Sequence, residues 1–198
     1  WSWNAVLPHF RGMEDNNRLL NDRHGAGGPL KVSDPGHIDQ MSRWFVQAVQ
    51  SLGEPFNPDF NGTSQRGVGF YQFMNRAGKR SSSAYAFIEP LLKDPKLDLK
   101  LQARVDKIII ENGRAKGVQY QDKAGTISVA LAEDAVVLSA GALITPKLLM
   151  LSGIGPADEL KKHSIGVALD LPGVGENLVD HPEVPMISTA NGKYGYHR

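Results

Sequence analysis

The spacing of apolar residues predicts two helices in the first third of the chain. Apolar side chains recur at helical intervals over residues 6–20 and, more regularly, over residues 37–52. The second segment is followed at once by Gly53, a residue suited to ending a helix, and is preceded by Ser33 and Asp34, either of which suits a cap at its start. A third, shorter helical segment is predicted over residues 83–92.

Alternating and β-prone segments predict strands, most of them in the second half. Asn112 and Gly113 lie between two such segments, and Asn-Gly is a strong signal for a tight hairpin turn. Three successive antiparallel strands are therefore expected as a β-meander. The predicted strands cover residues 29–32, 70–74, 97–103, 105–110, 115–121 and 126–131.

Residues 135–138 form a wholly apolar run, Ala-Val-Val-Leu, which is typical of a buried strand in a parallel sheet. The run leads through small residues, including Ala140 and Gly141, to a helix expected to begin at Thr145-Pro146 and to end near Ser152-Gly153. Small residues let the backbone approach a ligand, and a helix N-terminus favours negative charge. The same residues also fit an ordinary tight turn with a glycine cap, so both interpretations stay open.

The composition of the chain limits the kinds of molecule that it is expected to bind. The chain has 198 residues, 41% of them hydrophobic and 22% charged, and a net charge of +1, so neither nucleic acid nor an anionic membrane is indicated. No segment is apolar for long enough to span a bilayer. The absence of cysteine excludes disulfides and thiolate metal sites and fits a reducing compartment, from which a cytoplasmic location is predicted. Both ends read as cuts inside a longer protein.

No histidine has the surroundings expected of a metal ligand or a catalytic group. His181 follows Asp180, which is compatible with a proton relay, but adjacent side chains seldom face one another. The other histidines lack partners at metal-ligand spacing, so surface or structural roles are predicted for His9, His24, His37, His163 and His197. We therefore predict neither a catalytic residue nor a metal site within this chain.

Several blocks resemble the glucose–methanol–choline (GMC) oxidoreductases. Residues 141–155, GALITPKLLMLSGIG, match the second signature of that family position for position, and residues 171–182, LPGVGENLVDHP, resemble its next block. Other blocks occur in the order that the family shows, at residues 1–10, 59–62, 67–72 and 80–84. The chain therefore resembles an internal fragment of such an enzyme.

The resemblance implies an α/β fold of two parts. Residues 1–95 are expected to belong mostly to a sheet-and-helix substrate domain, residues 96–182 to a Rossmann-like FAD-binding domain with the β-meander, and residues 183–198 to a further piece of the substrate domain. FAD is the implied cofactor. By analogy with the family, the backbone of Val105 would meet the adenine, and Ala140 and Gly141 would pass close to the adenosine.

The implied reaction is oxidation of a small-molecule alcohol by hydride transfer to the flavin N5. Phe70 and Gln72, which share one face of an extended segment, are the candidate substrate-binding residues. The family's GxGxxG loop is absent, since the glycine-rich residues 25–28 follow no clear strand and open no helix. The catalytic histidine of the family is expected beyond residue 198, so the chain alone should be inactive and should need the remainder of its parent chain.

Two alternatives remain open from the sequence: a non-catalytic α/β binding module, and a flavin-containing lyase of the same family. The sequence does not identify the alcohol, the electron acceptor or the oligomeric state. It also does not distinguish an oxidase from a dehydrogenase. We also expect the isolated chain to be marginally stable, because an apolar strand at residues 135–138 would lack parallel neighbours.

Overall fold

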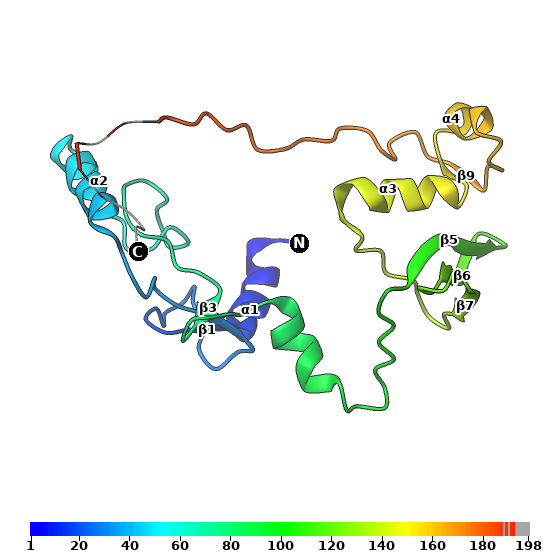
Figure 1. The fold of residues 1–198 in the computed structure, drawn as a ribbon, viewed down its shortest axis with the longest axis horizontal. Helices are drawn as coiled ribbons and strands as arrows, with labels where there is room; N and C mark the ends of the chain where they lie inside the picture. Colours follow the sequence, from blue (N-terminus) through cyan, green and yellow to red (C-terminus); the bar gives the residue numbers. More distant parts are fainter. Residues whose placement is uncertain (188, 190, 193–198) are drawn as a thin grey trace. The chain divides into compact units, whose positions relative to one another are not determined.

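The computed structural model describes residues 1–187, 189 and 191–192, and its chain divides into two compact units. Unit 1 comprises Trp1–Asp98 and the segment that begins at Met186, and unit 2 comprises Leu99–Pro185. Figure 1 shows the elements of each unit. Part of the segment 183–198, which the sequence assigns to a substrate domain, lies outside the described residues.

Unit 1 combines short helices with two small sheets. Its helical elements are α1 (Trp3–Met13), α2 (Gln40–Ser51), the π-helical turn η1 (Ala84–Ile88) and the 3₁₀ turn η2 (Glu89–Leu91). Its strands are β1 (Glu14–Asn16), β2 (Leu30–Val32), β3 (Asn75–Arg76) and β4 (Lys79–Arg80). Strands β1 and β2 pair in parallel, and β3 and β4 form an antiparallel hairpin.

The first predicted helix is shorter than its apolar pattern suggested. Helix α1 ends at Met13 because Glu14–Asn16 leave the helix to pair with β2. The predicted strand at residues 70–74 is also wrong in extent. Only Phe73 pairs there, through reciprocal hydrogen bonds of 3.0 and 2.9 Å with the backbone of Ser33.

Helix α2 confirms the second predicted helix but begins at a different cap. Asp39 accepts a hydrogen bond from the Ser42 N–H at 3.1 Å, which satisfies one of the free donors at the helix start. The expected cap Asp34 instead binds Arg18 through both carboxylate oxygens. Gly53 follows the helix with a positive φ of 95°, as its predicted role in ending the helix requires.

Unit 2 contains the predicted β-meander. Strands β5 (Arg104–Glu111), β6 (Arg114–Gln121) and β7 (Ile127–Leu131) pair antiparallel in that order. Asn112 and Gly113 both have positive φ, 50° and 74°, which matches the right-handed twist of a tight hairpin. The remaining elements are α3 (Gly141–Leu151), β8 (Ile154–Gly155), α4 (Ala157–Lys162) and β9 (Leu169–Asp170).

Helix α3 packs against β5. The N–H of Ile108 donates a 2.8 Å hydrogen bond to the Ser152 hydroxyl just beyond the helix, and Ile108 and Leu148 are both buried. The helix begins four residues before the expected Thr145-Pro146. Pro146 therefore lies inside the helix, where it lacks the N–H that the ladder would use.

Two predicted strands of unit 2 are absent. Residues 97–103 and 135–138 form no strand, and the side chain of Val137 is 85% exposed instead of buried. The reason at residues 135–138 is that no strand among the described residues lies alongside to pair with them. An apolar run specifies a buried strand only where the rest of a sheet is supplied.

Asp15 connects three segments of unit 1. Its carboxylate accepts hydrogen bonds from the Lys31 ammonium at 2.8 Å, the Arg76 guanidinium at 2.6 Å and the Gly27 N–H at 2.9 Å. The hydrogen bond from Lys31, with those from Gly27 and the charge of Arg76, lowers the pKa of Asp15 to about 2.

We predict that Asp15→Asn destabilises unit 1 at neutral pH and that this loss disappears in acid. A carboxylate with a lowered pKa stabilises the fold above its unfolded pKa of 3.8, and that stabilisation is lost as the pH falls toward 2. Urea unfolding of both proteins across this range measures the difference. A destabilisation that persists unchanged at the lowest pH would contradict the assignment.

We further predict that Gly117→Ala disrupts the pairing of β6 with β7. Gly117 has a φ of 154°, and a Cβ there would lie 2.2 Å from the Ala130 carbonyl oxygen. The strain should cost about 1–3 kcal/mol of unfolding free energy. Gly166→Ala, where no described atom lies within 4 Å of the added Cβ, is the control and should be close to neutral in the same denaturation measurement.

Candidate functional site

The predicted cofactor residues Ala140 and Gly141 form the start of α3. Ala140 caps the helix, and its N–H donates a 3.1 Å hydrogen bond to the Thr145 hydroxyl. Gly141 has a φ of 88°, a conformation that glycine adopts without strain. No described atom lies within 4 Å of the position that a Cβ would occupy at Gly141. This turn therefore presents bare backbone.

An open groove of about 530 Å³ lies over this turn. One side is formed by residues 140–144 and the other by Leu178, Val179 and Asp180. The first N–H groups of an α-helix have no partner within the helix and carry partial positive charge. The groove therefore offers backbone donors beside the apolar side chains of Leu178 and Val179.

Val105 lies on β5, opposite Tyr120, and is 38% exposed. The pairing register shifts between Val105 and Lys107, and a bulge of this kind leaves backbone groups outside the ladder. Such groups are available to a ligand, as recognition of adenine through the backbone would need. In the described part of the chain Val105 does not line the groove at Gly141, so its role stays a prediction.

The predicted substrate residues Phe70 and Gln72 lie in unit 1, and their side chains have different surroundings. Phe70 is half-buried and lines two hollows, one of about 490 Å³ beside α2 and one of about 200 Å³ beside β1. The amide of Gln72 is engaged within the protein, by Asn16 and by Asp34 at 2.9 Å. Phe70 thus offers a contact surface, whereas Gln72 fixes the segment that carries it.

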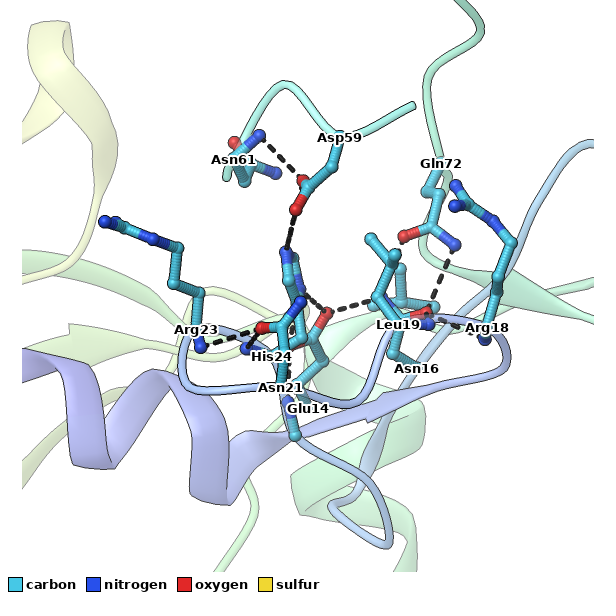
Figure 2. Close-up of polar contacts among 12 residues, drawn as sticks. Glu14, Asn16, Arg18, Leu19, Asn21, Arg23, His24, Asp59, Asn61 and Gln72 are labelled. Atoms are coloured by element: carbon cyan, nitrogen blue, oxygen red, sulfur yellow. Dashed lines mark hydrogen bonds and ion pairs between the residues drawn. The ribbon is translucent and has the colours of Figure 1, made fainter. Parts of the chain in front are cut away.

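A buried histidine also lines the smaller hollow. His24 is 5% exposed, and its two ring nitrogens face two carboxyl groups (Figure 2). Nδ1 lies 3.0 Å from Glu14 Oε1, and Nε2 lies 3.1 Å from Asp59 Oδ2. The histidine therefore connects β1 to the loop that follows α2.

Glu14 is held in its ionised form. Partial burial raises the pKa of its carboxyl, but hydrogen bonds from Asn16, His24 and the Gly25 N–H outweigh that effect and bring the pKa below its usual 4.5. The Asn16 amide donates at 2.8 Å and the Gly25 N–H at 3.0 Å. An ionised carboxylate can only accept hydrogen bonds, so the facing nitrogen of His24 must donate.

Sequence reasoning found only a general structural or surface role for His24. Its carboxylate partners are 10 and 35 residues away along the chain, so no local spacing indicates them. Asp59 lies in the sequence block 59–62 and Gly25 in the glycine-rich residues 25–28. Neither pattern indicates a contact with a histidine. In the parts of the chain that the structure describes, no group of three or more metal-ligating side chains is found.

The comparison with protein families decides the identity of the fold. The model of the GMC oxidoreductase family matches residues 1–183. The chain belongs to the GMC oxidoreductase family. The resemblance drawn from the sequence blocks is thereby confirmed, as is the mixed α/β fold that it implied.

Individual GMC relatives agree with the family match. The chain is 42% identical over 195 residues to an alcohol dehydrogenase [acceptor] of Pseudomonas putida, covering 98% of this chain and 35% of the relative. It is 41% identical to the mitochondrial choline dehydrogenase of Mus musculus, over 93% of this chain and 31% of the relative. The chain thus spans about a third of the length of these relatives.

Solved structures show the same fold. An FAD-dependent oxidoreductase of Chaetomium thermophilum superimposes with a TM-score of 0.81 and 30% identity, over 87% of this GMC chain and 32% of that one. Among the described residues, no helix is both long and apolar enough to cross a membrane.

Proposed function

We propose that this chain forms part of an FAD-dependent oxidoreductase that oxidises a small-molecule alcohol. The observation that carries the proposal is the GMC match over residues 1–183, together with the 42% identity to an alcohol dehydrogenase. Residues 1–95 would serve the substrate side and residues 96–182 the cofactor side. The cytoplasmic location remains a prediction from composition.

The residues at the start of α3 fit the cofactor. Bound FAD would supply the hydride acceptor, while the chain's own residues bind and orient. The exposed backbone at Ala140 and Gly141 and the bulge beside Val105 would hold the adenosine portion. Phe70 would face the alcohol from a segment fixed by Gln72. This chain would contribute binding surfaces and no proton-transferring group.

Absorption and turnover test the proposal directly. The purified protein that carries this chain should show the blue and near-ultraviolet bands of oxidised flavin, and alcohols should reduce a dye acceptor. A colourless protein that takes up no added FAD would overturn the proposal in favour of a binding module. Bound flavin without alcohol turnover would overturn the redox part and indicate a lyase.

We predict that Gly141→Ala weakens FAD binding more than it weakens the fold. Alanine at a φ of 88° costs about 1 kcal/mol, and its Cβ would fill space through which the cofactor approaches. The dissociation constant for FAD, measured by fluorescence titration, should rise roughly tenfold, which corresponds to about 1.4 kcal/mol.

Gly125→Ala is the matched control for this prediction. Gly125 has a similar φ of 84° and equally open space, but it lies in the turn between β6 and β7. Both variants should lose similar stability, and only Gly141→Ala should lose FAD affinity. Equal FAD affinity in the two variants would remove Gly141 from the cofactor site.

A further inference from the structure

The hydrogen bonds of His24 join two carboxyl groups. Each ring nitrogen faces one of them, Glu14 at 3.0 Å on one side and Asp59 at 3.1 Å on the other. The Glu14 carboxylate is ionised and only accepts hydrogen bonds, so the nitrogen that faces it donates. The ring therefore bridges two partly buried carboxyl groups, whose side chains are 17% and 16% exposed.

The groups around His24 come from separate segments. Glu14 is on β1, and Asp59 is on the loop after α2, where its carboxylate also accepts the Asn61 N–H at 3.0 Å. The neighbouring Arg23 turns its guanidinium over the Trp3 ring, 5.6 Å from the ring centre. The ring of His24 thus joins β1 to this loop through its two nitrogens.

A second set of hydrogen bonds extends from this cluster to the proposed substrate segment. Asn16 donates to Glu14, and its amide pairs reciprocally with the amide of Gln72 at 2.8 and 3.1 Å (Figure 2). The small hollow of about 200 Å³ is lined on one side by Glu14, His24 and Asp59, and on the other by residues 70–74. The position of Phe70 is therefore linked to the charged cluster through buried polar contacts.

We propose that His24, which bridges Glu14 and Asp59, is a positioning residue that holds the segment carrying Phe70 and Gln72 in place for substrate binding. The effect on substrate rests on the proposed function above, whereas the effect on the segment does not. Removing the ring would leave two partly buried carboxyl groups without the group that joins them, which loosens the contact between their two segments.

His24→Gln tests the proposal, because it removes the ring that bridges the two carboxyl groups. At about pH 7, hydrogen exchange of the Phe73 and Asn75 amides, which bond to Ser33 and Phe73, should lose protection about tenfold. Amides of β5 to β7 should keep their protection. His163→Gln is the matched control, since His163 forms an exposed pair with Glu159 at 3.2 Å and should leave both regions unchanged.

Asp59→Asn provides the second variant, because its amide can still form a hydrogen bond with the ring nitrogen that faces it. In the flavin-loaded protein, His24→Gln should raise KM for the alcohol about tenfold and change kcat much less, whereas Asp59→Asn should stay within about threefold of the wild-type KM. The FAD dissociation constant should change less than about twofold in every variant.

The exchange measurement decides the proposal. Unchanged exchange at Phe73 and Asn75 in His24→Gln would overturn it, and so would an unchanged KM for the alcohol in that variant. A protein without FAD binding or turnover would overturn the proposed function alone, because the exchange measurement would still decide the role of His24.

Discussion

The burial of His24 between the carboxyl groups of Glu14 and Asp59 is the constraint on which unit 1 depends. Among the described residues, all the buried polar side chains lie in this unit: Asn16, His24, Ser33, Asn57 and Ser81. Each is hydrogen-bonded, and the buried apolar residues beside them are few and small: Val46, Val68 and Ala86. A buried polar group without a partner costs more than it contributes, so the backbone of unit 1 must follow the geometry that satisfies all of them.

Unit 2 is stabilised mainly by buried apolar residues and by local turns. Its buried residues are apolar, Ile108, Leu148, Leu160 and Val174, and its sheet is a meander whose neighbours in space are neighbours in sequence. Turns with the required positive φ decide the pairing locally, while one hydroxyl, that of Ser152, joins helix to sheet. The same unit leaves Val137 and Leu143 85% and 68% exposed, so it carries more apolar residues than its own fold buries.

This contrast explains which features the sequence predicted. The meander, the Asn112-Gly113 turn and the Gly53 helix end depend on a few adjacent residues, and all three are confirmed. The strand predicted at residues 135–138 depends on pairing partners elsewhere in a sheet, which the local pattern does not show. The cap of α2 was predicted wrongly because Asp34 binds Arg18 and Asp39 caps the helix instead. The contact between His24 and Asp59 could not be predicted from the sequence, because the two residues are 35 positions apart and no periodic pattern connects them.

The candidate site contains both residues that the sequence alone could indicate and residues that it could not. Gly141 and Ala140 act through backbone, which gives no side-chain signature, so only the family blocks could indicate them. Phe70 and Gln72 would act through side chains. The amide of Gln72 forms hydrogen bonds with Asn16 and Asp34 and so fixes its segment, whereas the half-buried ring of Phe70 remains available as a surface. A flavin supplies its own redox chemistry, so a protein needs chiefly rigid surfaces on which to hold it and its substrate. Bare backbone at a helix start and a segment anchored by buried charge are two ways of making such surfaces.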